Sequence, residues 1–399
     1  MIRRLKIENF FSFGEPQTLD LRIAANATDP DGRFATPSAR PEVRLPRAAA
    51  IFGPNASGKT NLLRAFSFLL TFVKDSAQWR PDAKFPYLQF YGGTSPSQIS
   101  RFSLELDGTL RGEVPLSFTQ HPIVFRYDLA LNWHDSEVLE ETLKCYPQGR
   151  PRTLFTRERN VIHTGKDFRL PKGDPVRNKI RSNASVISTL AQFNHAFSLA
   201  IFSGLSALQT NVTVLGRYEL PHTAATQYYQ GVPDALDKLN GQIARFDFGI
   251  ERIALEKGQN GLEPWFYHRG LNIPIAIAFE SHGTQRFYAE FPKLYFVLNG
   301  GGVAIMDELD NDIHSLILPE IVRYFQDKRT NPYDAQLIMS CHNATLLEHL
   351  AKEEVFFTEK DDAGQTKIYG LKDVQGVRRD ANIYAKYLSG AFGGVPILG

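Results

Sequence analysis

One stretch of eight residues limits what this chain can fold into more than any other feature. Residues 53–60 read GPNASGKT and match the pattern G-x-x-x-x-G-K-[ST]. The apolar run Ala48–Phe52 precedes the stretch, and the helical pattern NLLRAFSFLLTFV follows it. In such a strand–loop–helix unit, glycines let backbone N–H groups approach phosphate oxygens, and the helix directs its positive end at the same place. The stretch therefore predicts an α/β fold with a phosphate-binding loop.

The fixed residues of this loop also predict what binds there. Lys59 would reach the β- and γ-phosphates of a nucleoside triphosphate, and the Thr60 hydroxyl would bind Mg²⁺. The residues predicted to contact the nucleotide are Gly53, Pro54, Asn55, Ala56, Ser57, Gly58, Lys59, Thr60 and Asn61.

An acidic pair follows a second predicted strand. Val303–Met306 is a run of four apolar residues, typical of a buried strand, and Asp307 and Glu308 stand at its carboxyl end. Ligands of open α/β sheets bind outside that end. Asp307 would hold Mg²⁺, and Glu308 would polarise the attacking water as a general base. An exposed acidic pair that caps the next helix is the alternative.

A short polar stretch opens the helix that leads to this acidic strand. It reads ESHGTQR and begins at Glu280. A helix N-terminus with a Ser and a Gly is a second anion site, and one nucleotide does not need two. We therefore expect this site to serve the nucleotide of a facing subunit, unless Ser281 or Thr284 is a plain N-cap. The predicted contacts are Ser281, Gly283, Thr284, Gln285 and Arg286.

A histidine ends the next predicted strand. Gln336–Ser340 is followed by Cys341 and His342. The strand should neighbour the acidic strand, so the imidazole of His342 could contact the γ-phosphate. A structural histidine is the alternative reading. Asp310, Asn311 and His314 could meet a dimer partner or form a solvated helix start.

Composition excludes several other classes of protein. The chain has 45 Lys and Arg against 43 Asp and Glu, which disfavours a strongly basic chromatin-type protein. Its two cysteines exclude a disulfide framework and a Cys-based zinc site, and they fit a reducing cytosol. The longest apolar runs fall short of the ~18 residues that a membrane span needs, so we expect a cytoplasmic protein without a membrane partner.

These four motifs, in this order, resemble the ATPase head of ABC-type proteins in the SMC/RecF/OLD branch. More narrowly, the phrases IENFFSFGE, ESHGTQRF, MDELDNDIH and RRDANIYAKYLSGAFGGVP resemble the AbiL/RloA-type ATPases of abortive-infection loci. The resemblance implies that residues 53–60 bind ATP, Asp307 supports Mg²⁺, Glu308 is the hydrolytic base and His342 senses the γ-phosphate. Ser281, Gly283 and Gln285 would act in trans, although SHGTQ departs from the LSGGQ form. Gln89 and Gln98 are both candidates for the Q-loop glutamine.

The resemblance also implies a fold and an assembly. The fold is an α/β ATPase head with a mixed or parallel core sheet, an antiparallel β subdomain and a helical insertion. Its predicted divisions are 1–140 with the phosphate-binding loop, a mostly helical lobe over 141–270, and 271–399 with the other motifs. Two copies, or a larger even number, would clamp ATP head to tail. Few residues follow His342, so a nuclease domain is not expected, and an effector such as a TOPRIM-like nuclease would be a separate polypeptide.

Three functions compete at this stage. The first is a phage-defence ATPase that controls this separate effector, and the resemblance favours it. The second is a RecF-like DNA-repair ATPase that binds nucleic acid directly, which the near-neutral charge mildly disfavours. The third is the ATP-binding subunit of a transporter, which the SHGTQ motif and the N-terminal strands disfavour.

Overall fold

A six-stranded sheet carries all the motif strands. The computed structural model describes residues 1–37, 43–92, 98–115, 118–170, 175–246, 249–258, 261–311, 317–378 and 381–395. The strand order is β11 (Leu208–Thr210), β17 (Val303–Met306), β18 (Gln336–Ser340), β5 (Ala48–Phe52), β19 (Val355–Lys360) and β20 (Thr366–Gly370). The first five strands run parallel, and β20 returns antiparallel to β19. The carboxyl ends of β5, β17 and β18 therefore lie at one edge of the sheet.

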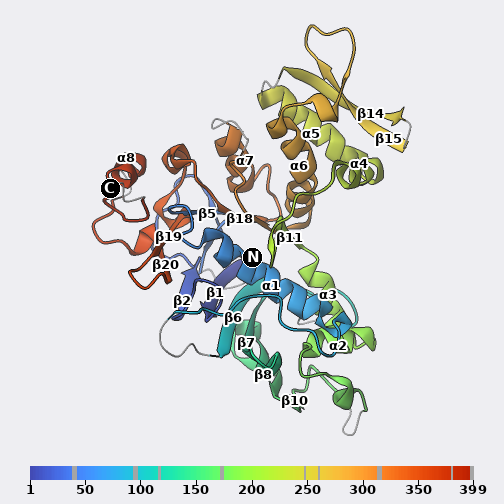
Figure 1. Ribbon diagram of the computed structural model, residues 1–399, viewed down its shortest axis with the longest axis vertical. Coiled ribbons are helices and arrows are strands. Elements are labelled where there is room, and N and C mark those ends of the chain that lie inside the picture. The colour runs from blue at the N-terminus through green and yellow to red at the C-terminus, as the bar shows by residue number, and fades with distance from the viewer. Residues whose placement is uncertain are drawn as a thin grey trace.

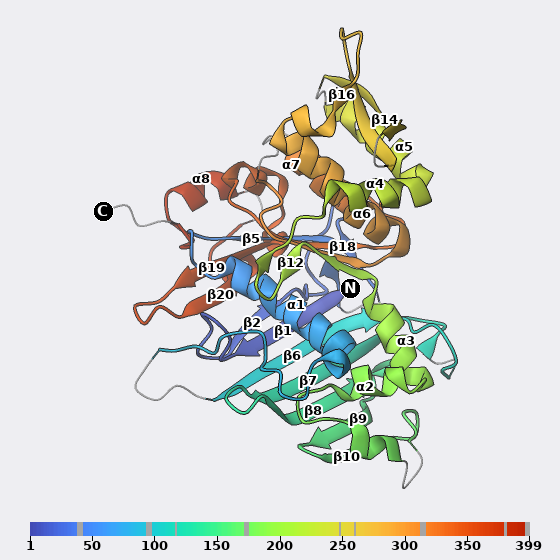
Figure 2. The same cartoon turned by 45° about the vertical axis from the view of Figure 1, so that its right-hand side comes forward.

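A seven-stranded antiparallel sheet forms a second layer. Its order is β10 (Val161–Thr164), β9 (Arg152–Glu158), β8 (Glu137–Cys145), β7 (Ile123–Asn132), β6 (Ile99–Gly108), β1 (Ile2–Glu8) and β2 (Gln17–Asp20). Strands β1 and β2 lie before Leu21, and β6, β7 and β8 lie between Ile99 and Cys145. Figure 2 shows this sheet below the central one, with helix α1 (Lys59–Asp75) between them.

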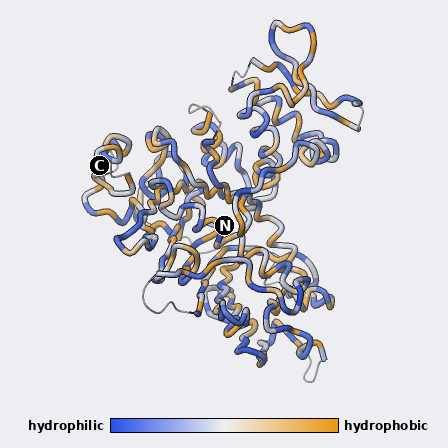
Figure 3. The backbone as a smooth tube through the Cα atoms, in the orientation of Figure 1, coloured by the Kyte–Doolittle hydropathy of each residue, from blue (hydrophilic) through white to orange (hydrophobic). Residues whose placement is uncertain are grey.

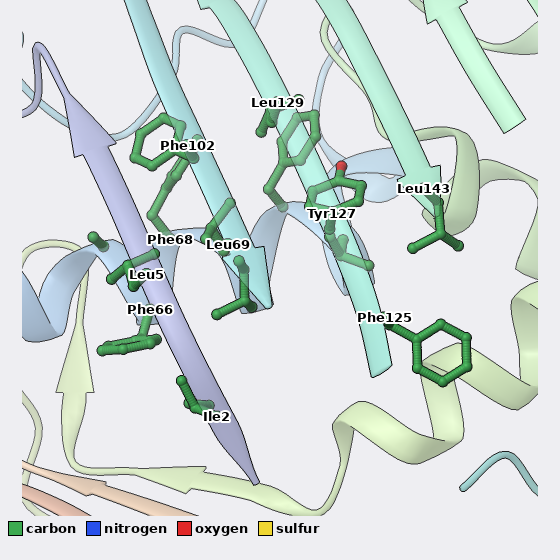
Figure 4. Packing of buried hydrophobic residues seen from close by; sticks show 14 of the residues in the cluster. Ile2, Leu5, Phe66, Phe68, Leu69, Phe102, Phe125, Tyr127, Leu129 and Leu143 are labelled. Atoms are coloured by element: carbon green, nitrogen blue, oxygen red, sulfur yellow. The ribbon is translucent and has the colours of Figure 1, made fainter. Parts of the chain in front are cut away.

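Helix α1 joins the two sheets because it is apolar on several sides. Phe66, Phe68 and Leu69 are buried in one hydrophobic cluster with side chains of β1, β6 and β7. Figure 4 shows Phe68 and Phe102 of β6 side by side, with ring centroids 5.2 Å apart. Strands of the central sheet alternate between the two clusters of the protein, so that Ile51 faces α1 and Phe52 faces the opposite layer.

The opposite layer covers the other face of the central sheet. It contains α6 (His282–Gly300), α7 (Ile317–Gln326), the 3₁₀ helix η6 (Ala344–His349) and α8 (Ile383–Leu388). Their apolar side chains share a cluster with Ala50, Met306 and Met339 of the sheet. The predicted helix that leads to the acidic strand is confirmed as α6, and residues 361–362 lie in the turn between β19 and β20.

A small lobe projects from this layer (Figure 1). It contains α4 (His222–Gly231), α5 (Pro233–Phe246), β14 (Ile250–Gly258), β15 (Gly261–His268) and β16 (Ile275–Ala276). Phe266 and Ile253 of its hairpin pack with Leu239 of α5 and Tyr288 of α6 in the second cluster.

The segment 141–270 differs from the prediction of a mostly helical lobe. Besides α2 (Val186–Gln192), α3 (Ala196–Leu205), α4 and α5, it contains strands of four sheets. Strands β9 and β10 extend the antiparallel sheet, and β11 is an edge strand of the central sheet. Strand β11 has three residues and pairs with β17, which lies far away in the sequence, so local apolar spacing does not predict it.

Several short strands and 3₁₀ helices connect the larger elements. They are β3 (Phe34–Ala35), β4 (Leu45–Pro46), β12 (Val212–Thr213), β13 (Gly216–Arg217) and the 3₁₀ helices η1 (Ser76–Gln78), η3 (Pro147–Gly149), η4 (Pro175–Lys179), η5 (Ile277–Phe279), η7 (Lys352–Glu354) and η8 (Leu371–Asp373). Hydrophobic and hydrophilic stretches alternate along the chain (Figure 3). In the described part of the chain, no helix combines the length and apolar character of a membrane span.

Candidate functional site

The P-loop, residues 53–60, leaves β5 at the carboxyl edge of the central sheet. Two of its glycines are required by close contacts. Gly53 has φ +153° and a Cβ there would lie 2.2 Å from the Thr358 carbonyl oxygen; Gly58 has φ +109° and a Cβ there would lie 2.2 Å from Thr366 Oγ1. Ala56, with φ +62°, is also left-handed. The loop is therefore tightly curved and pressed against the β19–β20 hairpin.

Lys59 and the start of α1 fit a bound phosphate chain. Lys59 Nζ is buried and donates to the carbonyl oxygens of Gly53 and Pro54 at 2.8 and 2.9 Å. Burial lowers the pKa of Lys59, whereas the nearby carboxylates of Asp307 and Glu308 oppose the change. The N-cap residue Gly58 gives no side-chain cap to the first-turn N–H groups of α1. These N–H groups and the ammonium form a site for an anion.

A chain of hydroxyl groups braces the P-loop from behind. Asn61 Nδ2 donates to Ser12 Oγ at 2.9 Å, Ser12 Oγ lies 2.7 Å from Thr366 Oγ1, and Thr366 Oγ1 lies 2.9 Å from the Ser57 carbonyl oxygen. The Thr366 hydroxyl has one proton and donates it to Ser12 Oγ or to the Ser57 carbonyl oxygen, and it stays within hydrogen-bond distance of both. These hydroxyl groups thus hold Ser57 and Asn61, which lie on either side of the residues with the phosphate-binding N–H groups.

Asp307 lies beside Thr60 and Ser340. The parallel register pairs Met306 with Met339, so the residues after them meet at the edge of the sheet. Thr60 Oγ1 donates to Asp307 Oδ2 at 2.9 Å, and Ser340 Oγ donates to Asp307 Oδ1 at 2.6 Å. The buried carboxylate is thereby aimed at the start of α1.

A hydroxyl and a carboxylate oxygen at this spacing suit Mg²⁺, a hard cation that prefers oxygen ligands. Thr60 and Asp307 are the residues that would hold it. The ion, when bound, would neutralise charge on the β- and γ-phosphates. Among the described residues, no three His, Cys, Asp or Glu side chains gather as a metal site of their own, as expected where phosphate and water complete the shell.

Glu308 is held in a left-handed backbone conformation with φ +49°. Its N–H donates to Ser340 Oγ at 2.7 Å, and its carbonyl oxygen accepts from Arg286 Nη2 at 2.6 Å. Because both peptide groups are anchored, the strain persists and turns the side chain outward. The carboxylate lies between Arg217 Nη1 at 2.9 Å and His342 Nε2 at 3.7 Å. Only about a third of the carboxylate-bearing side chain is exposed, and it can accept a proton from water there.

Asp310 places His342. Its Oδ2 accepts from the backbone N–H groups of His342 and Asn343 at 2.7 and 2.8 Å. The loop after β17 is thus tied to the loop after β18. Asn311 donates its N–H to the carbonyl oxygen of Glu308, and His314 lies outside the described residues.

We call the start of α6, residues 280–286, the signature tip; its last residue, Arg286, contacts the loop after β17. Ser281 is exposed and is the N-cap; its Oγ accepts from the Thr284 N–H at 3.2 Å. Gln285 Nε2 donates to the Glu280 carbonyl oxygen, and Glu280 Oε1 lies 2.6 Å from His268 Nε2. No hydrogen bond among these described residues joins the tip to the P-loop of the same chain.

Arg286 and Thr284 differ from the predicted nucleotide contacts. Arg286 is 8% exposed, and its guanidinium donates to the carbonyl oxygens of Glu308 and Asn311. The Thr284 hydroxyl is buried against Ser281 Oγ at 2.9 Å. Both side chains come from the inner side of α6, where the sequence motif alone gives no orientation. The structure therefore leaves Ser281, His282 and Gly283 as the outward part of the tip.

Gln89 and Gln98, the two candidates for the Q-loop glutamine, lie in different surroundings. Gln89 is buried, in a segment whose Leu88 carbonyl oxygen accepts from the Phe11 N–H in the β1–β2 loop. Gln98 is exposed, at the start of β6.

Three residues of the site are not among the predicted contacts. Asn211 is buried and pairs with the backbone of Asp307, accepting from its N–H at 2.7 Å and donating to its carbonyl oxygen at 3.0 Å. Ser340 and Arg217 contact the acidic pair directly. Only Ser340, the last residue of a motif strand, could have been found from strand ends; Asn211 and Arg217 follow a strand that the sequence does not signal.

The fold and the site define a P-loop protein with the fold of an SMC-type ATPase head. A family model described as "AAA domain, putative AbiEii toxin, Type IV TA system" matches residues 48–348, and the chain belongs to this family. No curated protein matches the chain.

One solved structure supports the fold, and two others are similar at lower TM-scores. A structure of the SMC head bound to the C-terminal winged-helix domain of ScpA has a TM-score of 0.50 at 12% identity, covering 92% of this chain and 96% of that one. The SMC head domain from Thermotoga maritima covers 92% and 98%, with a TM-score of 0.46 at 13% identity. An SMC head with an extended coiled coil, bound to the C-terminal domain of ScpA from Pyrococcus furiosus, covers 93% and 96%, with a TM-score of 0.45 at 13% identity.

Proposed function

We propose that this protein binds and hydrolyses ATP between two copies of the chain. The P-loop of one copy holds the triphosphate, and the signature tip of the other copy closes over its γ-phosphate. The observation that carries the proposal is that the outward residues of the signature tip make no hydrogen bond to the P-loop of the same chain, among the described residues. Ser281 is exposed, and its hydroxyl contacts Thr284 of its own helix. Lys59, Thr60, Asp307, Glu308 and His342 instead gather at one edge of the sheet.

The gathered residues support hydrolysis rather than binding alone. Lys59 and the first N–H groups of α1 neutralise and orient the phosphates. Glu308 accepts a proton from the attacking water. His342 contacts the γ-phosphate, and its backbone N–H is bonded to Asp310, so this contact is linked to the loop after β17. Ser281 and Gly283 add a second helix N-terminus from the partner copy.

The finer part of the proposal concerns the cell. We infer that the ATP-bound dimer controls a separately encoded effector of a phage-defence system of the abortive-infection type, as in the AbiL/RloA group. The family description names a toxin–antitoxin system, and the SMC heads with a similar fold have been solved with ScpA, a partner protein. Two unpaired, buried cysteines suit the reducing cytoplasm.

Two variants test the shared site. Glu308→Gln should bind ATP, hydrolyse it slowly and accumulate as a dimer, measured by phosphate release and light scattering with ATP and Mg²⁺. Ser281→Arg should bind ATP as a monomer but neither dimerise nor hydrolyse it, whereas Ser389→Arg, at another exposed serine, should behave like the wild type. Equal loss of ATP binding in monomeric Ser281→Arg would contradict the proposal, and so would normal turnover by Glu308→Gln.

The effector is tested separately. The wild type and Glu308→Gln, each purified from its source cells with ATP, should retain the product of a neighbouring gene, more of it in the trapped dimer. Tight duplex-DNA binding by the lone protein, weakening steeply with salt, would instead support the DNA-repair function.

A further inference from the structure

Arg217 stands at the hydrolytic site although no motif contains it. It ends the β12–β13 hairpin, and its side chain is 27% exposed. Nη1 lies 2.9 Å from Glu308 Oε2, and Nη2 lies 2.7 Å from Glu219 Oε1. The Arg217 guanidinium is therefore paired with Glu308, the carboxylate proposed to polarise the attacking water.

The hairpin is rigidly joined to the acidic strand. Strand β11 pairs with β17, and the Asn211 side chain continues this pairing onto both peptide groups of Asp307. Val212 directly follows and is buried in the first cluster, where it pairs with Arg217 across the hairpin. The Cα position of Arg217 is thus set relative to Asp307 and Glu308.

The hairpin is also joined to the P-loop helix. Arg64 on α1 donates from Nη2 to the Leu215 carbonyl oxygen at 3.2 Å, and Val214 is buried beside α1 in the same cluster. The hairpin therefore spans the two elements between which a γ-phosphate would lie, the start of α1 and the end of β17.

The distance to a γ-phosphate follows from the chemistry of the site. The water that Glu308 polarises has to touch both the carboxylate and the γ-phosphorus. A guanidinium in contact with that carboxylate is therefore separated from the γ-phosphate only by the carboxylate and this water. Arginine suits the task because its planar fork can bond two phosphate oxygens at once.

We propose that Arg217 is a catalytic residue of this site, acting on the triphosphate bound by its own chain; the inference rests on the proposed ATP hydrolysis. Before ATP binds, the guanidinium pairs with Glu308. With ATP bound, it moves to the γ-phosphate oxygens, which frees Glu308 Oε2 to receive the water's proton. The water oxygen then bonds to the γ-phosphorus, the bond to the β–γ bridging oxygen breaks, and ADP leaves with that electron pair.

The test compares three variants of the full chain. Arg217→Ala should lower kcat about a hundredfold, as removal of one preorganised donor to developing charge does, and keep ATP binding and ATP-dependent dimerisation. Arg217→Lys should fall between, because an ammonium cannot bond two oxygens as a fork does. Glu219→Gln is the matched control, because it alters the other arm of the guanidinium and should keep the wild-type kcat.

Each outcome decides the inference. A kcat of Arg217→Ala equal to that of the wild type overturns it, and so does a higher kcat, which would make the ion pair a restraint on Glu308. A loss of ATP binding in both the alanine and the lysine variant also overturns the inference. Arg217 would then stabilise bound ATP itself and not the transition state of hydrolysis. If the wild type itself hydrolyses no ATP, the proposed function fails first; an active wild type with a fully active Arg217→Ala rejects only the inference.

Discussion

Replacing Ser340 with alanine should destabilise the acidic corner of the site. Ser340 is fully buried, and its hydroxyl makes two hydrogen bonds at once. It donates to Asp307 Oδ1 at 2.6 Å and accepts from the Glu308 N–H at 2.7 Å. The variant removes the hydroxyl, so Asp307 Oδ1 loses a hydrogen-bond donor and the strained Glu308 N–H loses its acceptor.

The magnitude follows from the kinds of bond that are lost. A hydrogen bond to an ionised group contributes about 1.5–3 kcal/mol, and a buried N–H left unpaired costs about 1–3 kcal/mol. The two terms share one hydroxyl and do not add fully, so we expect the free energy of unfolding to fall by about 3 kcal/mol. The left-handed peptide of Glu308 should also relax, which lowers kcat more than ATP binding.

Urea unfolding of the ATPase head, followed by tryptophan fluorescence and circular dichroism, measures this change. Ser389→Ala is the control, because Ser389 is exposed and its Oγ contacts only the Lys386 carbonyl oxygen; it should change stability by less than about 0.5 kcal/mol. If Ser340→Ala unfolds within this margin of the wild type, the hydroxyl does not hold the acidic corner and our reasoning is refuted.

Three further predictions concern the P-loop and a buried carboxyl group. Lys59→Ala should weaken ATP binding or stop turnover, measured by calorimetry and phosphate release, because the triphosphate loses its main cation; unchanged binding and turnover would contradict this. Thr366→Val removes the hydroxyl that contacts Ser12 and Ser57 and should raise the Kd for ATP, whereas Thr366→Ser should keep the wild-type Kd. Equal affinities of the two variants would contradict a role of this hydroxyl in holding the P-loop. Burial raises the pKa of Glu354 from 4.5 to about 7, so the folded state binds its proton more tightly than the unfolded state. Its contribution to stability is full below about pH 4.5 and is lost as the pH rises through 7, by roughly 1.4 kcal/mol per pH unit over that window, and Glu354→Gln should flatten this slope.

The sequence predicts the centre of the site because parallel strands bring their carboxyl ends together. Once 48–52, 303–306 and 336–340 are assigned as strands of one sheet, Lys59, Asp307 and His342 must lie near one another. Their spacing in the chain does not matter, since the edge of the sheet supplies the proximity.

Other contacts could not be predicted because they depend on tertiary packing. Ser12, in the phrase IENFFSFGE, and Thr366, in none of the quoted motifs, meet although 354 positions separate them. Arg217 depends on β11, an edge strand of three residues whose partner strand lies outside the local sequence. Arg286 belongs to the motif, but the motif does not show that its side chain turns inward to Glu308.

A cross-linking experiment tests the central claim, that the signature tip of one copy acts on the nucleotide of another. Asn55→Cys and Ser281→Cys are placed in separate preparations that also carry Glu308→Gln; both positions are exposed, and the native cysteines Cys145 and Cys341 are buried. With ATP, Mg²⁺ and a short bis-maleimide, we predict a cross-linked dimer in the mixture of the two preparations and none in either alone. The same amount of cross-linking with and without ATP, or none in the mixture, would contradict the shared site.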